Sequence, residues 1–274
     1  CRYFETMFAK LLIIPFALMA AIGLYLSWEY VEGWTWLIIV GVIGGAFLLI
    51  FSPQINWWYY HRNPPDVEPD VRQMLERQDL FYNALSPLEK DRFRQRMALF
   101  MMGTQFMPQG WETVPHDMEA IVAASAVKVR FAQEELLFKT CERVVVYPTP
   151  FPSPMHPEEW HSSEWFDEDG VVLFSARELV RGFFQPSQFI ALAVYEYCRI
   201  LRAEQPQLPW PALPEDPWTL IQHISGWDRV AVCQMIGLQS VDPAAVLASL
   251  WFSHYHRMAQ VEGQWAEKYL LVFG

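Results

Sequence analysis

The sequence predicts an α+β protein in which two membrane-spanning helices precede a mostly helical domain with a small β-sheet. Residues 11–28 and 33–60 carry no charge, and each stretch is long enough to cross a bilayer as a helix, which takes about 20 residues. Helix-start signals and apolar stripes recur after residue 70. Only residues 143–147 and 170–175 form the short β-branched or apolar runs that are typical of strands.

The N-terminal part, residues 1–62, is expected to form a transmembrane hairpin with spans at about 11–28 and 33–52. Aromatic residues of the kind found at membrane interfaces flank the two spans: Trp28, Trp34, Trp36, Trp57, Trp58, Tyr59 and Tyr60. A hairpin buried in a soluble core is the alternative.

Charge predicts the orientation of this hairpin. The link between the spans holds only Glu29 and Glu32, whereas Arg2, Lys10 and Arg62 lie on the other side. The positive-inside bias therefore places both termini and the large domain in the cytoplasm. A processed lipoprotein cysteine at Cys1 is the alternative, and it would place the domain outside.

Composition excludes some functions. The net charge is −11, nearly all of it after residue 52, and no basic cluster is present. Nucleic-acid binding is therefore not expected, since it depends on concentrated positive charge. The cysteines are scattered and form no CxxC pair, so the sequence predicts neither a zinc ribbon nor a disulfide framework: Cys1, Cys141, Cys198 and Cys233.

Residues 63–84 are expected to form a linker and a helix. The Pro-rich acidic segment 63–70 is a stiff connection, and a helix follows from Val71 to Asn83. Ser86-Pro87-Leu88-Glu89 combines an N-cap, a proline at the first helical position and a glutamate three residues after the cap. This pattern predicts a helix that runs to about Met102. Another helix is expected over residues 115–135.

The two strands are expected to form a small antiparallel sheet against a helical body. Residues 149–165, between them, are Pro-rich and are expected to form a loop that carries His156 and His161. A short helical piece follows the second strand, and an amphipathic helix follows it over residues 189–202. The remaining helices are expected near residues 218–225, 228–236, 243–260 and 262–273.

The helix over residues 189–202 carries Tyr195-Glu196-Tyr197-Cys198-Arg199. A zinc peptidase helix has His-Glu-x-x-His, because histidines at i and i+4 share one face and can bind one metal. Here Glu196 matches the glutamate, but Tyr195 and Arg199 stand at the histidine positions. Neither is an ordinary zinc ligand, and a guanidinium repels a cation. We expect Arg199 to pair with Glu196 and to take the electrostatic place of the cation; an exposed pair of little weight is the alternative.

From Leu85 to the C-terminus, the order of landmarks resembles that of the MtfA-type zinc-dependent peptidases. The landmarks are LSPLEKDRFRQRM at 85–97, IVAASA from Ile121, VVVYPTPF at 144–151, GVVLFS at 170–175 and then the helix with Glu196. The resemblance implies a zincin-like domain over residues 85–274. It also implies that Glu196 corresponds to the general base of the family.

The same resemblance implies a third, acidic ligand on a later helix. In residues 243–252 the expected positions fall near Ala245, Trp251 and Phe252, and no carboxylate lies between Asp242 and Glu262. With these ligands missing, we expect no metal, no other cofactor and no peptidase activity, because a catalytic zinc needs three protein ligands and an open position.

A rebuilt metal site is the alternative. His156 and His161 could meet Glu164 in the loop before the second strand. His254 and His256 are a less suitable pair, since residues two apart on a helix do not share a face.

These inferences favour a catalytically inactive, membrane-anchored pseudopeptidase of the bacterial inner membrane, an accessory or scaffold subunit of a larger membrane complex. Its expected partners are other subunits, contacted through the hairpin and the aromatic and Pro-rich loops, and the lipid bilayer. Since the strand before the zinc helix borders the substrate cleft in the resembling enzymes, a partner strand is expected to pair with Val171, Val172, Leu173 and Phe174. The alternatives are an active membrane-anchored metallopeptidase with non-standard ligands, and a regulator that sequesters a cytoplasmic protein at the membrane.

Overall fold

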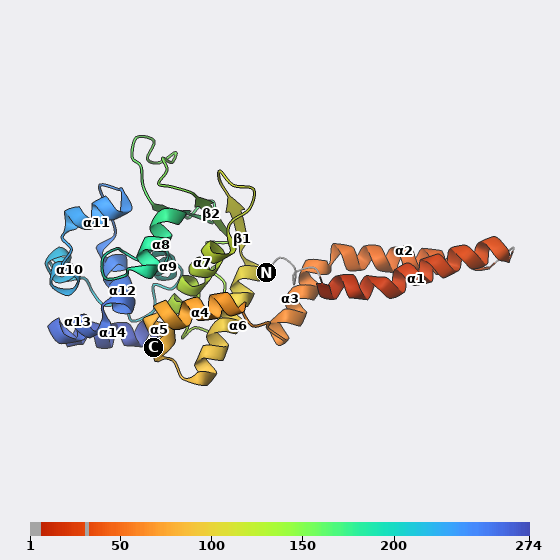
Figure 1. Cartoon of the computed structure of the whole chain (residues 1–274), viewed down its shortest axis with the longest axis horizontal. Coiled ribbons are helices and arrows are strands. Elements are labelled where there is room, and N and C mark those ends of the chain that lie inside the picture. Colours follow the sequence, from red (N-terminus) through yellow and green to blue (C-terminus); the bar gives the residue numbers. More distant parts are fainter. Residues whose placement is uncertain (1–6, 31–32) are drawn as a thin grey trace. The chain divides into compact units, whose positions relative to one another are not determined.

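The computed structural model describes residues 7–30 and 33–274, so the prediction about Cys1 lies outside the described residues. The chain divides into two compact units, Cys1–Pro65 and Asp66–Gly274 (Figure 1). The helix expected from Val71 to Asn83 therefore belongs to the second unit, where it is divided into two helices at Asp79.

The first unit contains α1 (Met7–Glu29), α2 (Thr35–Ile50) and α3 (Ser52–Arg62). In residues 7–30 and 33–274, one helix, Ala9–Glu29, is by itself long and apolar enough to cross a membrane. The second span is not confirmed as predicted, because α2 has 16 residues and is about 24 Å long, short of the ~30 Å bilayer core. It continues into α3 across a bend of 64°, and Pro53 stands at the start of α3.

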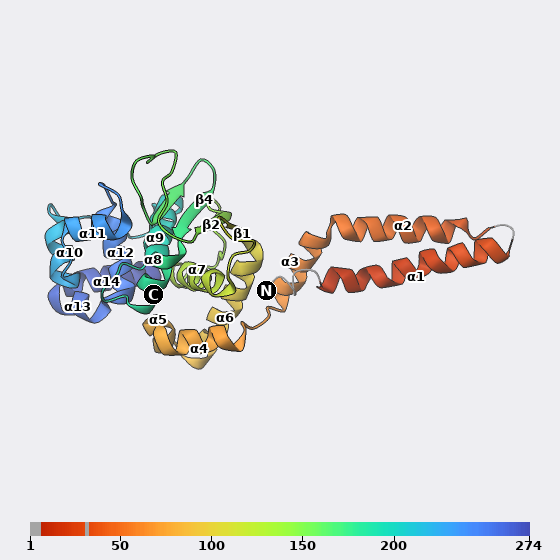
Figure 2. The ribbon, with the colours of Figure 1, turned by 45° about the horizontal axis from the view of Figure 1, so that its top comes forward.

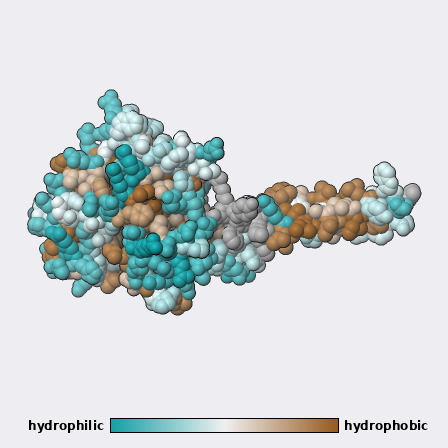
Figure 3. Space-filling view, in the orientation of Figure 1, coloured by the Kyte–Doolittle hydropathy of each residue, from teal (hydrophilic) through white to brown (hydrophobic). Residues whose placement is uncertain are grey.

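The two long helices of the hairpin pack closely through small residues. A side chain at Gly41 would meet the backbone oxygen of Phe16 at 2.7 Å, and one at Gly44 would meet the Phe16 ring at 2.3 Å. Near the other end, the backbone N–H of Ala9 donates to Asn56 Oδ1 over 3.0 Å. The outward surface of α1 and α2 is hydrophobic over most of its length (Figure 3), as expected of helices that face lipid.

The second unit begins with α4 (Pro69–Gln78), α5 (Leu80–Ala84) and α6 (Pro87–Gly103). The capping box predicted for α6 is present, with Ser86 and Glu89 bonded to each other's backbone N–H groups. Helix α7 (His116–Val129) is shorter than the predicted 115–135, because the chain turns away from the helix axis after Arg130.

The sheet contains β1 (Gln105–Pro108), β2 (Arg143–Tyr147), β3 (Ser163–Phe166) and β4 (Val171–Ser175) in the order β1-β2-β4-β3. The β1–β2 and β2–β4 pairs are parallel, and only β3–β4 is antiparallel. The expectation of an antiparallel sheet is therefore wrong. The chain leaves β2, forms β3 and turns at Gly170, and so β4 returns beside β2 in the same direction.

Strand β4 lies inside the sheet, with β2 bonded along one edge and β3 along the other. Pairing of a partner strand with Val171, Val172, Leu173 and Phe174 stays a prediction, although the backbone groups that such pairing requires are already bonded within the sheet. A partner strand could reach β4 only if β3 left it.

The remaining helices are α8 (Ala176–Phe184), α9 (Leu192–Glu204), α10 (Pro217–Ser225), α11 (Arg229–Ile236), α12 (Pro243–Ser253), α13 (Tyr255–Val261) and α14 (Gly263–Phe273). Helix α9 packs against α7, α12, α8 and strands β3 and β4 (Figures 1 and 2). The helix predicted over 243–260 is interrupted at His254, which ends α12 and precedes α13.

Candidate functional site

Helix α9 is largely enclosed by the rest of the second unit. Every residue from Leu192 to Cys198 is buried, whereas Arg199 is the first position along the helix that is partly open to solvent. Because α7, α12 and the sheet cover different sides of α9, polar groups on this helix need partners from the protein.

Glu196 is 1% exposed, and both of its carboxylate oxygens are hydrogen-bonded. Ser163 Oγ, on β3, donates to Oε1 over 2.8 Å, and Arg199 Nη1 donates to Oε2 over 2.7 Å. The predicted pairing of Glu196 with Arg199 is thus confirmed. It is a buried, charge-assisted contact rather than an exposed one, since the Arg199 side chain is only 30% exposed.

Arg199 stays protonated and positively charged. The negative charge of Glu196 is the main cause that raises the pKa of the Arg199 guanidinium, although burial opposes it. The rings of Trp165 and Tyr195 lie 5.9 and 5.8 Å from the guanidinium carbon, within the range in which an aromatic face attracts a cation. The position of the second helix histidine in a zinc peptidase is therefore taken by a permanent cation.

Tyr195 occupies the other histidine position and has a structural contact of its own. Its hydroxyl oxygen accepts the backbone N–H of Asp242 over 3.1 Å. Asp242 in turn caps α12, because its Oδ1 accepts from the N–H of Ala244 over 2.9 Å. Burial raises the pKa of the Tyr195 hydroxyl, so the phenol stays neutral and connects α9 to the start of α12.

The positions expected to supply an acidic ligand lie inside the packing of α12. Ala245, Trp251 and Phe252 are all buried, and the indole N–H of Trp251 donates to the Ala266 carbonyl over 3.1 Å. None of these three side chains offers an oxygen or nitrogen acceptor to a metal.

Residues 55–197 match the family described as glucose-regulated metallo-peptidase M90. The chain belongs to this family. The match confirms the MtfA-type resemblance, and it covers the segment from α3 to the middle of α9, ending one residue after Glu196. No curated protein matches the chain.

The M90 family name implies a metal, but the residues of this chain do not fit one. A zinc site needs three donors such as imidazole, thiolate or carboxylate, and this helix offers a neutral phenol, a carboxylate already bonded at both oxygens and a guanidinium. Across residues 7–30 and 33–274, no group of three His, Cys, Asp or Glu side chains is arranged to hold a metal ion.

The structure does bring together His161 and Glu164 of the loop alternative. His161 is fully buried; its Nε2 lies 2.9 Å from Glu164 Oε2, and its Nδ1 lies 3.0 Å from the Glu159 carbonyl oxygen. Burial lowers the pKa of His161, but the hydrogen bond to Glu164 and further contacts outweigh it and leave the pKa raised. His156 lies 3.8 Å from Glu164 and 3.0 Å from Glu159. These contacts hold the loop to the edge of the sheet.

The other histidine pair is not assembled into a site. His254 is half-buried against the Trp227 ring, with 5.3 Å between ring centroids, and His256 contacts the Tyr255 ring at 5.8 Å.

Sequence reasoning missed Ser163 and Trp165, which approach Glu196 and Arg199 from β3. The signal is the alternation over residues 163–166, which places these two side chains on one face of a strand. It was obscured by the prolines of the preceding loop. Asp242, the last carboxylate before the later helix in the sequence, caps that helix. No local signal indicates its second contact, in which its backbone N–H donates to the Tyr195 hydroxyl.

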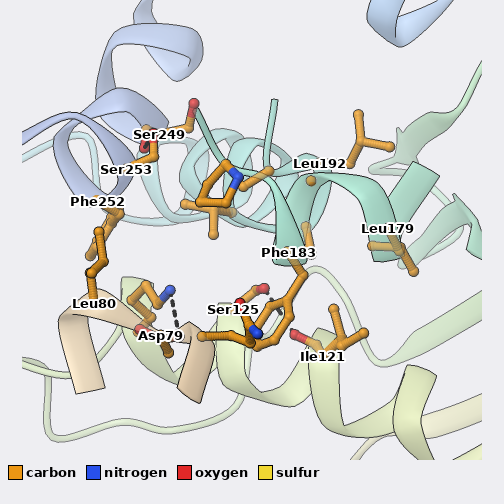
Figure 4. Close-up of a pocket in the computed structure, with 17 residues that line it drawn as sticks. Asp79, Leu80, Ile121, Ser125, Leu179, Phe183, Leu192, Ser249, Phe252 and Ser253 are labelled. Carbon is orange, nitrogen blue, oxygen red and sulfur yellow. Dashed lines mark hydrogen bonds and ion pairs between the residues drawn. The ribbon is translucent and has the colours of Figure 1, made fainter. Parts of the chain in front are cut away.

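A small cavity lies beside the first turn of α9 (Figure 4). Its volume is about 40 Å³, enough for a few water molecules but not for a peptide side chain. Asp79 and Lys128 pair across 2.7 Å at its wall, and Ser125 donates to the Ile121 carbonyl over 2.9 Å. The cavity belongs to the packing of the core.

Proposed function

We propose that this chain is a catalytically inactive M90 protein that is anchored in the bacterial inner membrane and acts by binding protein partners. The observation that carries the proposal is the buried contact between Arg199 and Glu196. In this arrangement the carboxylate that would serve a metal-bound water is neutralised by a guanidinium of the same helix.

Electrostatics supports the loss of the metal. A divalent cation within about 4 Å of the Arg199 guanidinium would meet a repulsion of about 8 kcal/mol at an effective dielectric constant of about 20. Attraction to Glu196 offsets much of this repulsion, but the paired charges sum to zero, so the pair lacks the net negative charge with which a metal site holds a dication. Peptidase activity would therefore require Arg199 to leave its position.

The membrane part of the proposal is supported by α1, which is apolar and long enough to span a bilayer. The bent α2–α3 element is proposed to complete the anchor, with the large unit on the cytoplasmic side. An inactive domain that keeps its fold and its anchor suits an accessory or scaffold subunit of a membrane complex. The apolar outer surface of the hairpin and the exposed Met155 and Trp160 of the Pro-rich loop offer contact surfaces.

Metal content and partner content test the proposal together. The full chain is isolated from membranes in mild detergent, and its zinc is measured next to a Tyr195→His/Arg199→His variant, which restores the two helix ligands. We expect substoichiometric zinc in the parent chain and stoichiometric membrane partners that co-purify with it. One zinc per chain with chelator-sensitive peptidase activity would overturn the proposal.

The family match favours a second candidate, an active metallopeptidase with non-standard ligands. This candidate predicts that Glu196→Gln abolishes activity and leaves partner binding intact. A regulator that sequesters a cytoplasmic protein is distinguished by its partner, which would be soluble and would exchange reversibly, whereas a scaffold keeps membrane subunits at fixed stoichiometry.

A further inference from the structure

A larger cavity lies within the second unit, between α5 and the C-terminal helices α12, α13 and α14. Its volume is about 660 Å³, within the range of small-molecule sites. It shares Leu80 and Phe252 as lining residues with the small cavity of Figure 4. The proposed function makes no use of this cavity.

The inner wall of the cavity is aromatic and preformed. The Phe252 ring lies 5.7 Å from Phe81 and 4.9 Å from Trp251, and Trp251 lies 5.7 Å from Tyr255. Trp251 and Phe252 are buried, and the Trp251 indole is fixed by its hydrogen bond to Ala266. A ligand therefore meets ordered rings and has little side-chain motion to restrict.

The rim of the cavity exposes apolar side chains. Leu80 is 64% exposed and Leu270 is 49% exposed, and they come from α5 and α14. Together with the aromatic wall they give an apolar surface that a hydrocarbon or aromatic group can cover, with a gain of about 25 cal/mol per Å² of apolar area removed from water.

Charge at the cavity has one sign. The chain has 31 acidic and 20 basic residues, yet the lining contains no Asp or Glu and includes Arg257, His254 and His256. The Arg257 Nε donates to the His223 carbonyl over 3.2 Å. Within the described parts of the chain, its guanidinium forms no ion pair with a carboxylate. A cation thus stands at an apolar cavity without an anionic partner.

His254 also lines the cavity and is a neutral polar group. Burial, and then the charge of Arg257, lower the pKa of His254, so that its ring is uncharged near neutral pH. Its Nδ1 lies 2.8 Å from Ser253 Oγ. Arg257 therefore supplies the positive charge.

We propose that this cavity binds a small apolar monocarboxylic acid, whose body lies against the aromatic wall and whose carboxylate pairs with Arg257. An amine would meet only positive charge, and an alcohol would leave the guanidinium without a counter-charge. A carboxylate satisfies it by charge-assisted hydrogen bonds, for which the planar donor geometry of arginine is well suited.

The test uses 4-phenylbutyrate as the probe, with 4-phenylbutanol and 4-phenylbutylamine as charge controls. Binding to the full chain in lipid nanodiscs is measured by isothermal titration calorimetry, and empty nanodiscs give the blank. We expect saturable binding of one acid per chain. The alcohol is expected to bind about tenfold more weakly, since charge-assisted hydrogen bonds are about twice as strong as neutral ones. The amine is expected not to bind.

Two variants locate the site. Arg257→Gln is expected to weaken binding of the acid about tenfold, whereas Arg229→Gln, at an exposed arginine of α11, leaves it unchanged. Ala84→Phe places a ring in the cavity from an exposed position on α5 and is expected to abolish binding. Arg257 and Ala84 are both exposed, so neither Arg257→Gln nor Ala84→Phe is expected to change the melting temperature.

The absence of saturable binding would overturn the proposal, as would equal affinities for acid, alcohol and amine or an unchanged affinity in Arg257→Gln. A cavity filled by a second copy of the chain would also overturn it. In that case Ala84→Phe would lower the molecular mass in solution, and the acid would compete with self-association instead of binding one per chain.

Discussion

Replacing Arg199 with methionine is expected to destabilise the large unit by about 3 kcal/mol. Glu196 is 1% exposed, and the substitution leaves its carboxylate with only the hydroxyl of Ser163. Removing one partner of a buried ion pair costs about 3–5 kcal/mol, because an uncompensated charge remains. The lower end applies here, since the Arg199 side chain is 30% exposed and its departure admits some water.

The reverse substitution is expected to cost less. In Glu196→Gln, the amide oxygen can still accept from Ser163, and Arg199 can turn toward solvent, so about 1–2 kcal/mol is lost. The double variant Glu196→Gln/Arg199→Met leaves no unpaired charge. We expect it to be more stable than Arg199→Met alone, with a coupling energy of about 1–3 kcal/mol between the two positions.

Urea unfolding of the full chain in mild detergent, followed by tryptophan fluorescence, measures these differences. The matched control is Arg72→Met. Arg72 pairs with Glu76 over 3.0 Å, and both side chains are about half-exposed, so its loss is expected to cost less than about 0.5 kcal/mol. If Arg199→Met costs no more than this control, or if the cycle shows no coupling, the contact on α9 carries no more weight than a surface pair and the reasoning is refuted.

Two further predictions concern the loop before β3. Because the pKa of His161 is raised in the folded chain, its stabilisation is complete below about pH 6.5 and is lost as the pH rises through the folded-state pKa. Melting temperatures measured from pH 6 to 9 are expected to fall more for the parent chain than for Glu164→Gln, and parallel curves would contradict this assignment. Gly237→Ala is expected to cost more than about 2 kcal/mol. Its φ is +90° and its Cβ would lie 2.3 Å from the Trp160 carbonyl oxygen. Gly226→Ala, with φ +82° and open space around it, is the control and bears only the backbone cost, about 1–2 kcal/mol; equal losses in urea unfolding would refute the clash.

Features that depend on residues close together in the chain can be predicted from the sequence. The capping box of α6 requires only Ser86 and Glu89, three residues apart, and the structure contains it. The apolar composition of residues 11–28 predicted α1. The pairing of Glu196 with Arg199 also follows from helix geometry, since i and i+3 side chains share a face. In the structure, Arg199 Nη1 lies 2.7 Å from Glu196 Oε2.

Tertiary structure alone decided what surrounds this pair. Ser163 is 33 residues from Glu196, and Asp242 is 47 residues from Tyr195. Neither contact can be read from local periodicity, because each depends on how the sheet and α12 pack against α9. The order of the strands in the sheet also depends on contacts between distant segments. Strand pairing is a non-local choice, and the short run at β3 was not distinguishable from a loop until β4 supplied its hydrogen-bonding partner. Local patterns thus predict the helices and the ion pair. The burial that makes this ion pair important for stability depends on the packing of distant segments.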